Sequence, residues 1–182
     1  MRNLAPSAHK GGTGGSERMS RQGKIAASLG DGAVGTHRQV AALCWRMHGG
    51  APEVLLITSR DTGRWIVPKG WPMADRSAAA TAAQEAWEEA GVRGEIDEAS
   101  LGAFHYPKLY DDADPRLCKV EVFALRVEGL AHRYPERGQR RRKWFSLAKA
   151  ARRVGEPELR TLILDFAGDA SAAGAGTAAT PS

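Results

Sequence analysis

Long apolar segments are absent from this chain, and their absence limits where the protein can reside. No stretch approaches the roughly 18 consecutive apolar residues that a membrane-spanning helix needs. The N-terminal residues also lack the apolar run of a secretion signal. We therefore expect no membrane partner and a cytoplasmic location.

Cysteine is equally scarce, which argues against two further classes of protein. The chain has two cysteines, Cys44 and Cys118, each inside an apolar, strand-like run and without neighbours at metal-ligand spacing. A disulfide framework and a cysteine-bound zinc site are therefore not expected. Both cysteines are predicted to be buried thiols.

Acidic residues are nearly absent from one basic segment, Arg133 to Arg153, in which Glu136 stands alone among lysines and arginines. The whole chain has a formal net charge of +5. Because this charge is unevenly placed, the basic segment should attract anions. No RNA- or DNA-binding motif accompanies the segment, so a nucleic acid is not the expected partner.

The chain does contain enough apolar sequence for one folded domain. Of its 182 residues, 42% are hydrophobic, which favours a single core and leaves too few residues for two ordinary domains. Residues 1–35 and 168–182 are rich in small and polar residues and lack apolar periodicity, so we expect both to be disordered. The folded domain is predicted over residues 36–167.

Strand-like and helix-like patterns interleave within that domain, which predicts a mixed α/β fold. Apolar runs at 39–45 and 53–58 flank a Gly-Gly-Ala-Pro segment and predict a β-hairpin. The alanine-rich stretch 77–90 lacks glycine and proline and precedes Gly91, so it predicts a helix. The other expected elements are strands at 64–67, 101–106, 120–127 and 144–145, and a helix at 159–166.

Three glutamates on the predicted helix gather negative charge on one face. Glu85, Glu88 and Glu89 are separated by steps that place their carboxylates within reach of each other. A magnesium ion, which prefers hard oxygen ligands, would offset their repulsion. The alternative is a solvated surface helix. We favour the metal site, because Lys69 and Gly70 begin a phosphate-compatible loop at the foot of this helix.

The segment from Gly70 to Val92 resembles the signature of the Nudix hydrolases, G-x(5)-E-x(7)-R-E-U-x-E-E-x-G-U, where U is a bulky aliphatic residue. The matching positions are Gly70, Glu85, Glu88, Glu89, Gly91 and Val92. The departures are Arg76, Gln84 and Ala86, where the signature has Glu, Arg and an aliphatic residue. Since the signature's first Glu and its Arg can form an ion pair, their joint change affects that pair more than metal binding.

The resemblance implies an α/β/α sandwich with a mixed sheet and dependence on Mg²⁺ or Mn²⁺. It also implies that a metal-activated water hydrolyses a diphosphate bond. On this basis Glu85, Glu88 and Glu89 would be the catalytic carboxylates and would hold the metal together with Gly70. Glu88 or Glu89 would act as the general base.

Resemblance continues from about Arg38 to Phe166 and indicates a phosphate-rich substrate. The basic run 140–143, followed by Trp-Phe, is similar to diphosphoinositol polyphosphate phosphohydrolases, and the Pro-Lys-Gly at 68–70 is similar to dinucleoside polyphosphate hydrolases. Alternation along a strand predicts that only part of the basic run faces the site. The candidate substrate-binding residues are Lys69, Gly70, Arg64, Lys108, Arg140, Arg141 and Lys143.

We therefore expect a metal-dependent pyrophosphohydrolase that cleaves a diphosphate bond in a small phosphorylated substrate, either a diphosphoinositol polyphosphate or a dinucleoside polyphosphate. One alternative is hydrolysis of ADP-ribose, a nucleoside triphosphate or an RNA 5′ end. Another is a catalytically silent Nudix module that binds a ligand or a nucleic acid. The sequence does not predict the oligomeric state.

Overall fold

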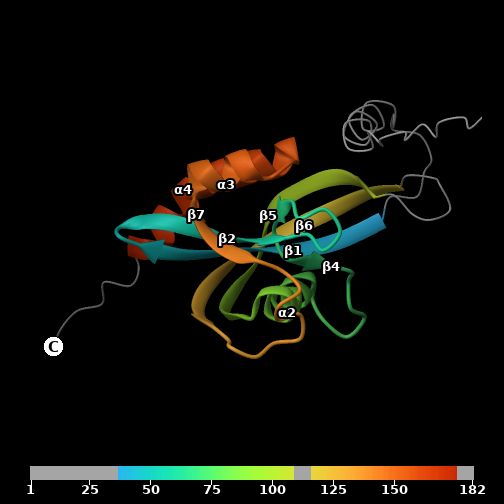
Figure 1. Ribbon diagram of the computed structural model, residues 1–182. Helices are drawn as coiled ribbons and strands as arrows, with labels where there is room; N and C mark the ends of the chain where they lie inside the picture. The colour runs from blue at the N-terminus through green and yellow to red at the C-terminus, as the bar shows by residue number, and fades with distance from the viewer. Residues whose placement is uncertain (1–36, 109–115, 176–182) are drawn as a thin grey trace, which may run out of the picture.

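A computed structural model describes residues 37–108 and 116–175 of the chain (Figure 1). The N-terminal range 1–35, predicted to be disordered, lies outside the described residues, and so do residues 176–182 of the predicted C-terminal tail.

The predicted hairpin is confirmed. It consists of β1 (His37–His48) and β2 (Ala51–Thr58), which pair antiparallel with Trp45 opposite Val54. The turn is shorter than the predicted four residues, because Gly49 and Gly50 alone make it with φ angles of 58° and 78°. Glycine adopts these positive φ angles without a steric penalty, so a two-residue turn suffices.

Within the described residues, seven strands form one sheet. Its main order is β3-β2-β1-β6-β5, with β4 pairing to β1 and β7 to β2. The parallel pair is β1 with β6, and the other pairs are antiparallel, which confirms a mixed sheet. The remaining strands are β3 (Trp65–Ile66), β4 (Lys69–Gly70), β5 (Val92–Lys108), β6 (Arg116–Leu130) and β7 (Arg142–Ser146).

Helices cover both faces of this sheet, which confirms the α/β/α sandwich (Figure 1). One face packs against α2 (Ala78–Ala90), and the other packs against α3 (Leu147–Arg153) and α4 (Pro157–Ala175). Alternate residues of β1 enter the two cores: Val40, Ala42 and Cys44 face α2, and Ala41, Leu43 and Trp45 face α3 and α4. Both cysteines are buried and free, as predicted.

The structure differs from the sequence prediction mainly in element length. β5 and β6 extend beyond the predicted 101–106 and 120–127, because their ladder continues through exposed positions without apolar alternation. The short helix α3 is absent from the sequence prediction, since seven residues show little periodicity. α4 ends at Ala175, so the expected disorder does not hold for residues 168–175, whose alanines favour a helix.

Membrane-spanning helices are not found among the described residues: α2, α3 and α4 all lack the combination of length and apolar character that a bilayer crossing requires.

Candidate active site

The helix that carries the three glutamates has well-formed ends. The Ser77 hydroxyl oxygen accepts a hydrogen bond from the Ala80 amide at 3.1 Å, which caps the first turn of α2. Gly91 ends the helix with a φ of 65°, a left-handed conformation that favours glycine. The face of α2 that packs on the sheet consists of alanines, so α2 approaches the sheet closely and its glutamates lie elsewhere on its surface.

The carboxylate of Glu85 lies directly against Gly70. A Cβ atom at position 70 would be 2.0 Å from Glu85 Oε1, which is closer than any side chain can come. The sequence predicts a loop at Gly70, but Gly70 lies in β4, paired opposite Val40 of β1. A larger residue at position 70 would therefore displace the Glu85 carboxylate.

Glu89 is buried and held by two groups from outside α2. Its Oε2 accepts a hydrogen bond from the Lys69 amide at 3.0 Å, and its Oε1 accepts one from the Arg140 guanidinium. Arg140 also donates to Glu136 Oε2 at 2.6 Å and to the Thr58 carbonyl at 3.1 Å. Arg140 therefore ties α2 to the end of β2.

Glu88 is connected to both polar departures from the Nudix signature. The Gln84 amide donates to Glu88 Oε1 at 2.6 Å, and Gln84 Oε1 accepts a hydrogen bond from Arg76 at 2.9 Å. The two residues that replace the signature's Arg and Glu thus still contact each other. They form a hydrogen bond between a guanidinium and a neutral amide in place of an ion pair, and Gln84 extends the link to Glu88.

The local electrostatics disfavour the simultaneous ionisation of all three glutamates on α2. Burial, together with the charges of Glu89, Glu88 and Glu136, raises the pKa of Glu85 to about 7. Glu85 makes no hydrogen bond or ion pair with any described residue. Its carboxylate is therefore the one of the three that no hydrogen bond from a described residue holds in place.

The donor chemistry of this group fits a divalent cation, although the side chains are not gathered around one point. Among the described residues, no three acidic, histidine or cysteine side chains form a ready metal site. Two of the three carboxylates are engaged elsewhere, since Glu88 bonds to Gln84 and Glu89 to Arg140. Hard oxygen donors that repel one another, one of them unpaired, nevertheless suit Mg²⁺ or Mn²⁺.

Three of the predicted substrate-binding cations are related to the carboxylate group, by a direct bond from Arg140 and by electrostatic interaction among Glu89, Lys69 and Lys108. Besides Arg140, these are Lys69, whose ammonium lies 4.9 Å from the Tyr106 ring, and Lys108, whose ammonium lies 4.9 Å from the Trp71 ring. Burial lowers the pKa of Lys69, the charge of Glu89 opposes this effect, and the charge of Lys108 adds to it. Lys69 and Lys108 are therefore close enough to serve one anion.

The other three predicted cations are not brought together with the carboxylates. Arg64 pairs with Glu156, which precedes α4, at 3.5 Å. Arg141 is exposed over the Trp65 ring, and Lys143 is exposed beside Phe145, whose side chain belongs to the core under α3 and α4. Residue alternation explains the separation, because Arg141 and Lys143 point to the opposite face of the sheet from Arg140.

Glu136 is a member of the site that the sequence analysis did not assign. It lies between Arg60, at 3.4 Å, and Arg140, and its backbone amide donates to the Glu88 carbonyl at 3.0 Å. The sequence offers one signal for the role of Glu136. It is the single acid in a basic segment, and it lies four residues before Arg140. The contact with α2 depends on tertiary structure and has no local pattern.

Comparison with known proteins gives a family match over more than half of the chain. The family model described as NUDIX domain matches residues 35–166. Nudix hydrolase 12, mitochondrial, from Arabidopsis thaliana is 33% identical over 101 residues, which cover 54% of this chain and 50% of that protein. Diphosphoinositol polyphosphate phosphohydrolase 3-alpha from Mus musculus is 30% identical over 118 residues, covering 64% and 68%.

A solved structure agrees with this match at the level of the fold. Ap4A hydrolase from C. elegans superposes with a TM-score of 0.54 at 20% sequence identity, covering 74% of this chain and 98% of that one. The chain spans about half the length of Nudix hydrolase 12 and 64% of Nudix hydrolase 16 from Arabidopsis thaliana.

Proposed function

This chain belongs to the Nudix family, and from that premise we propose that its domain, residues 36–167, is a metal-dependent pyrophosphohydrolase. The observation that carries the proposal is the carboxylate of Glu85, which has no hydrogen-bond partner among the described residues and lies against Gly70 among other glutamates, within electrostatic reach of Lys69. Such a site offers oxygen donors for a cation and cations for a phosphate.

In this proposal Glu85, Glu88 and Glu89, with Gly70 beside them, hold Mg²⁺ or Mn²⁺. A bound ion of this kind supplies Lewis acidity and lowers the pKa of a coordinated water. Arg140 fixes the orientation of Glu89, and Gln84 fixes that of Glu88. Glu88, which is less buried than Glu89 and has no cationic partner among the described residues, is the better placed general base.

For the substrate we propose a diphosphoinositol polyphosphate or a dinucleoside polyphosphate. Lys69 and Lys108 provide two adjacent positive charges next to the carboxylates, which suits a chain of phosphates. The exposed Trp71 ring beside Lys108 offers a surface for a nucleobase and thus favours the dinucleoside substrate. The mouse relative is named for the inositol substrate.

A panel of substrates tests this proposal. With Mg²⁺ present, we expect the purified protein to hydrolyse a diphosphoinositol polyphosphate or a dinucleoside tetraphosphate with a higher kcat/KM than ADP-ribose, a nucleoside triphosphate or capped RNA. A higher kcat/KM for ADP-ribose, a nucleoside triphosphate or capped RNA would mean that the substrate belongs to that second group. Binding of these compounds without turnover, with either Mg²⁺ or Mn²⁺, would instead identify a silent binding module.

Location in the cytoplasm stays a prediction, and several plant relatives carry organelle names.

The link from Arg76 through Gln84 to Glu88 leads to a testable expectation. Gln84→Ala should weaken Mn²⁺ binding and turnover about tenfold, because outer partners of metal ligands typically contribute that much. Restoring the signature with Arg76→Glu and Gln84→Arg together should recover both. Mn²⁺ affinity is measured by electron paramagnetic resonance, with the exposed Gln139→Ala as the matched control. Wild-type Mn²⁺ affinity in Gln84→Ala would contradict the positioning role.

A further inference from the structure

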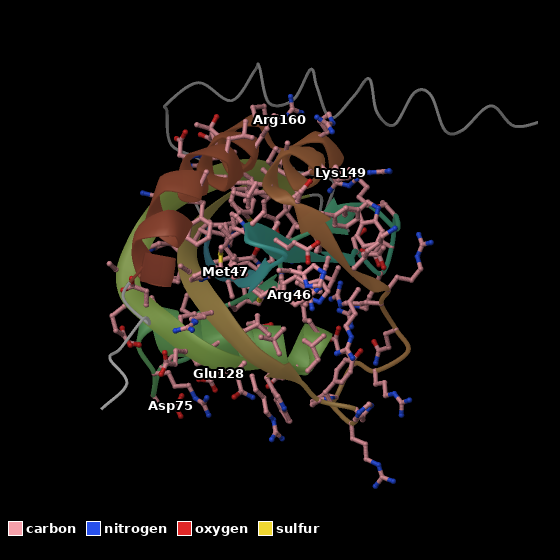
Figure 2. All side chains as sticks on the ribbon, turned by 90° about the vertical axis from the view of Figure 1, so that its left-hand side faces the viewer. Arg46, Met47, Asp75, Glu128, Lys149 and Arg160 are labelled. Atoms are coloured by element: carbon pink, nitrogen blue, oxygen red, sulfur yellow. The ribbon has the colours of Figure 1, made fainter. Side chains whose placement is uncertain are left out.

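A second concentration of charge lies away from the carboxylates, around a hollow between β7 and α3. The hollow has a volume of about 450 Å³. Its lining comes from Glu53 of β2, from 143–146 in β7, and from Lys149, Arg152 and Arg153 of α3. Figure 2 labels Lys149 and also Arg46, which bonds to the lining residue Glu53.

Four of the lining side chains are cations without acidic partners. Lys149, Arg152 and Arg153 are spaced so that they share one face of α3, and Lys143 approaches from β7. None of these four makes a hydrogen bond or ion pair with a described residue. The one acid in the lining, Glu53, already accepts two hydrogen bonds from Arg46, at 2.8 and 3.1 Å. The hollow therefore has a surplus of positive charge.

Helix electrostatics explain only part of this arrangement. Arg152 and Arg153 lie in the last turn of α3, where cations are favourable next to free carbonyl groups. That reason does not extend to Lys149, near the middle of α3, or to Lys143 on a different element. Four like charges around one hollow repel each other unless an anion lies between them.

The hollow is separate from the carboxylate group. Arg140, which bonds to Glu89, precedes the lining segment 143–146 by three to six residues of extended chain. At about 3.3 Å per residue, that separation is roughly 10–20 Å. Arg141 and Lys143 also point to the other face of the sheet.

We propose that this hollow is a second anion site, which binds a small condensed phosphate of at least three phosphate groups. Four unpaired cations match the charge of such a compound, and guanidinium and ammonium groups are the side chains that bind phosphate best. The proposal does not depend on the hydrolase activity, because binding here needs neither a metal nor the carboxylates.

Two tryptophans allow the two sites to be observed separately. Trp144 belongs to the β7 segment that lines the hollow. Its ring packs against the core under α2, with the Arg46 guanidinium 4.2 Å from the ring centre. Trp71 lies next to Lys108, whose charge acts on Lys69 beside Glu89. Titration of the metal-free protein with inorganic tripolyphosphate should therefore shift the Trp144 indole signal in an NMR spectrum before that of Trp71. The variants Trp144→Phe and Trp71→Phe assign the two signals.

A charge-matched pair of triple variants tests whether the side chains of the hollow, rather than the net charge of the protein, bind tripolyphosphate. Replacing Lys149, Arg152 and Arg153 with glutamine should weaken tripolyphosphate binding about tenfold or more, since three charge-assisted contacts are lost. Replacing the exposed Arg93, Lys119 and Arg126 on β5 and β6 with glutamine removes the same charge elsewhere and should change binding less than about threefold. Circular dichroism checks that each variant is folded.

Three results would overturn the proposal. Equal losses in the two triple variants would mean that net charge alone attracts the anion. A shift of Trp71 without a shift of Trp144 would place the phosphate at the carboxylate site. Tight binding of a single-stranded oligonucleotide at Trp144, with no binding of tripolyphosphate, would show that the hollow serves a nucleic acid instead.

Discussion

Replacing Glu85 with glutamine is expected to lower metal-dependent turnover by about a hundredfold or more while the protein stays folded. The amide keeps the size of the carboxylate next to Gly70 but loses the negative charge that would hold the ion. Turnover and Mg²⁺ affinity are measured for the variant and for Glu128→Gln, an exposed glutamate on β6 (Figure 2). Equal turnover in both variants would remove Glu85 from the site.

The raised pKa of Glu85 gives an independent readout of the same variant. This group has its ordinary pKa of 4.5 when unfolded and about 7 when folded, so the folded state binds more protons between these values. The metal-free protein should therefore lose stability as the pH rises from 4.5 through 7. Glu85→Gln should remove that loss and be more stable than wild type at pH 8. Mg²⁺ affinity in wild type should rise over the same range, because a proton no longer competes.

Replacing Arg140 with methionine is expected to lower the free energy of unfolding by about 3–5 kcal/mol, because the change leaves a buried carboxylate unpaired. The side chain of Arg140 is 7% exposed and bridges Glu89, Glu136 and the Thr58 carbonyl. The adjacent Arg141→Met is the matched control, and its exposed side chain should contribute less than about 0.5 kcal/mol. Urea denaturation measures both variants.

A second substitution separates this structural role from a direct contact with substrate. If Arg140 mainly compensates Glu89, then Glu89→Gln added to Arg140→Met should restore a large part of the lost stability. A substrate contact would show the reverse pattern, with unchanged stability and a raised KM. Equal stabilities of Arg140→Met and Arg141→Met would contradict the structural role.

The sequence predicts the grouping of the three glutamates, because that signal is local. Helical spacing alone places the three carboxylates within reach of each other, and the alanines opposite them predict which face packs on the sheet. It also predicted the hairpin and the α2 boundaries, because glycines and Ser77 mark them. It failed for β4, whose two residues become a strand only because β1 lies alongside.

Tertiary structure decided which of the basic residues contact the carboxylates and which do not. From the sequence, Arg140, Arg141 and Lys143 form one basic run, and nothing local distinguishes them. In the fold, Arg140 bonds to Glu89, whereas Arg141 and Lys143 lie over the Trp65 and Phe145 rings, which belong to the core under α3 and α4. The chain by itself therefore determined the chemical groups and their family signature. Only packing between distant segments decided which charges meet, because burial and pairing depend on contacts across the sheet rather than on neighbours in sequence.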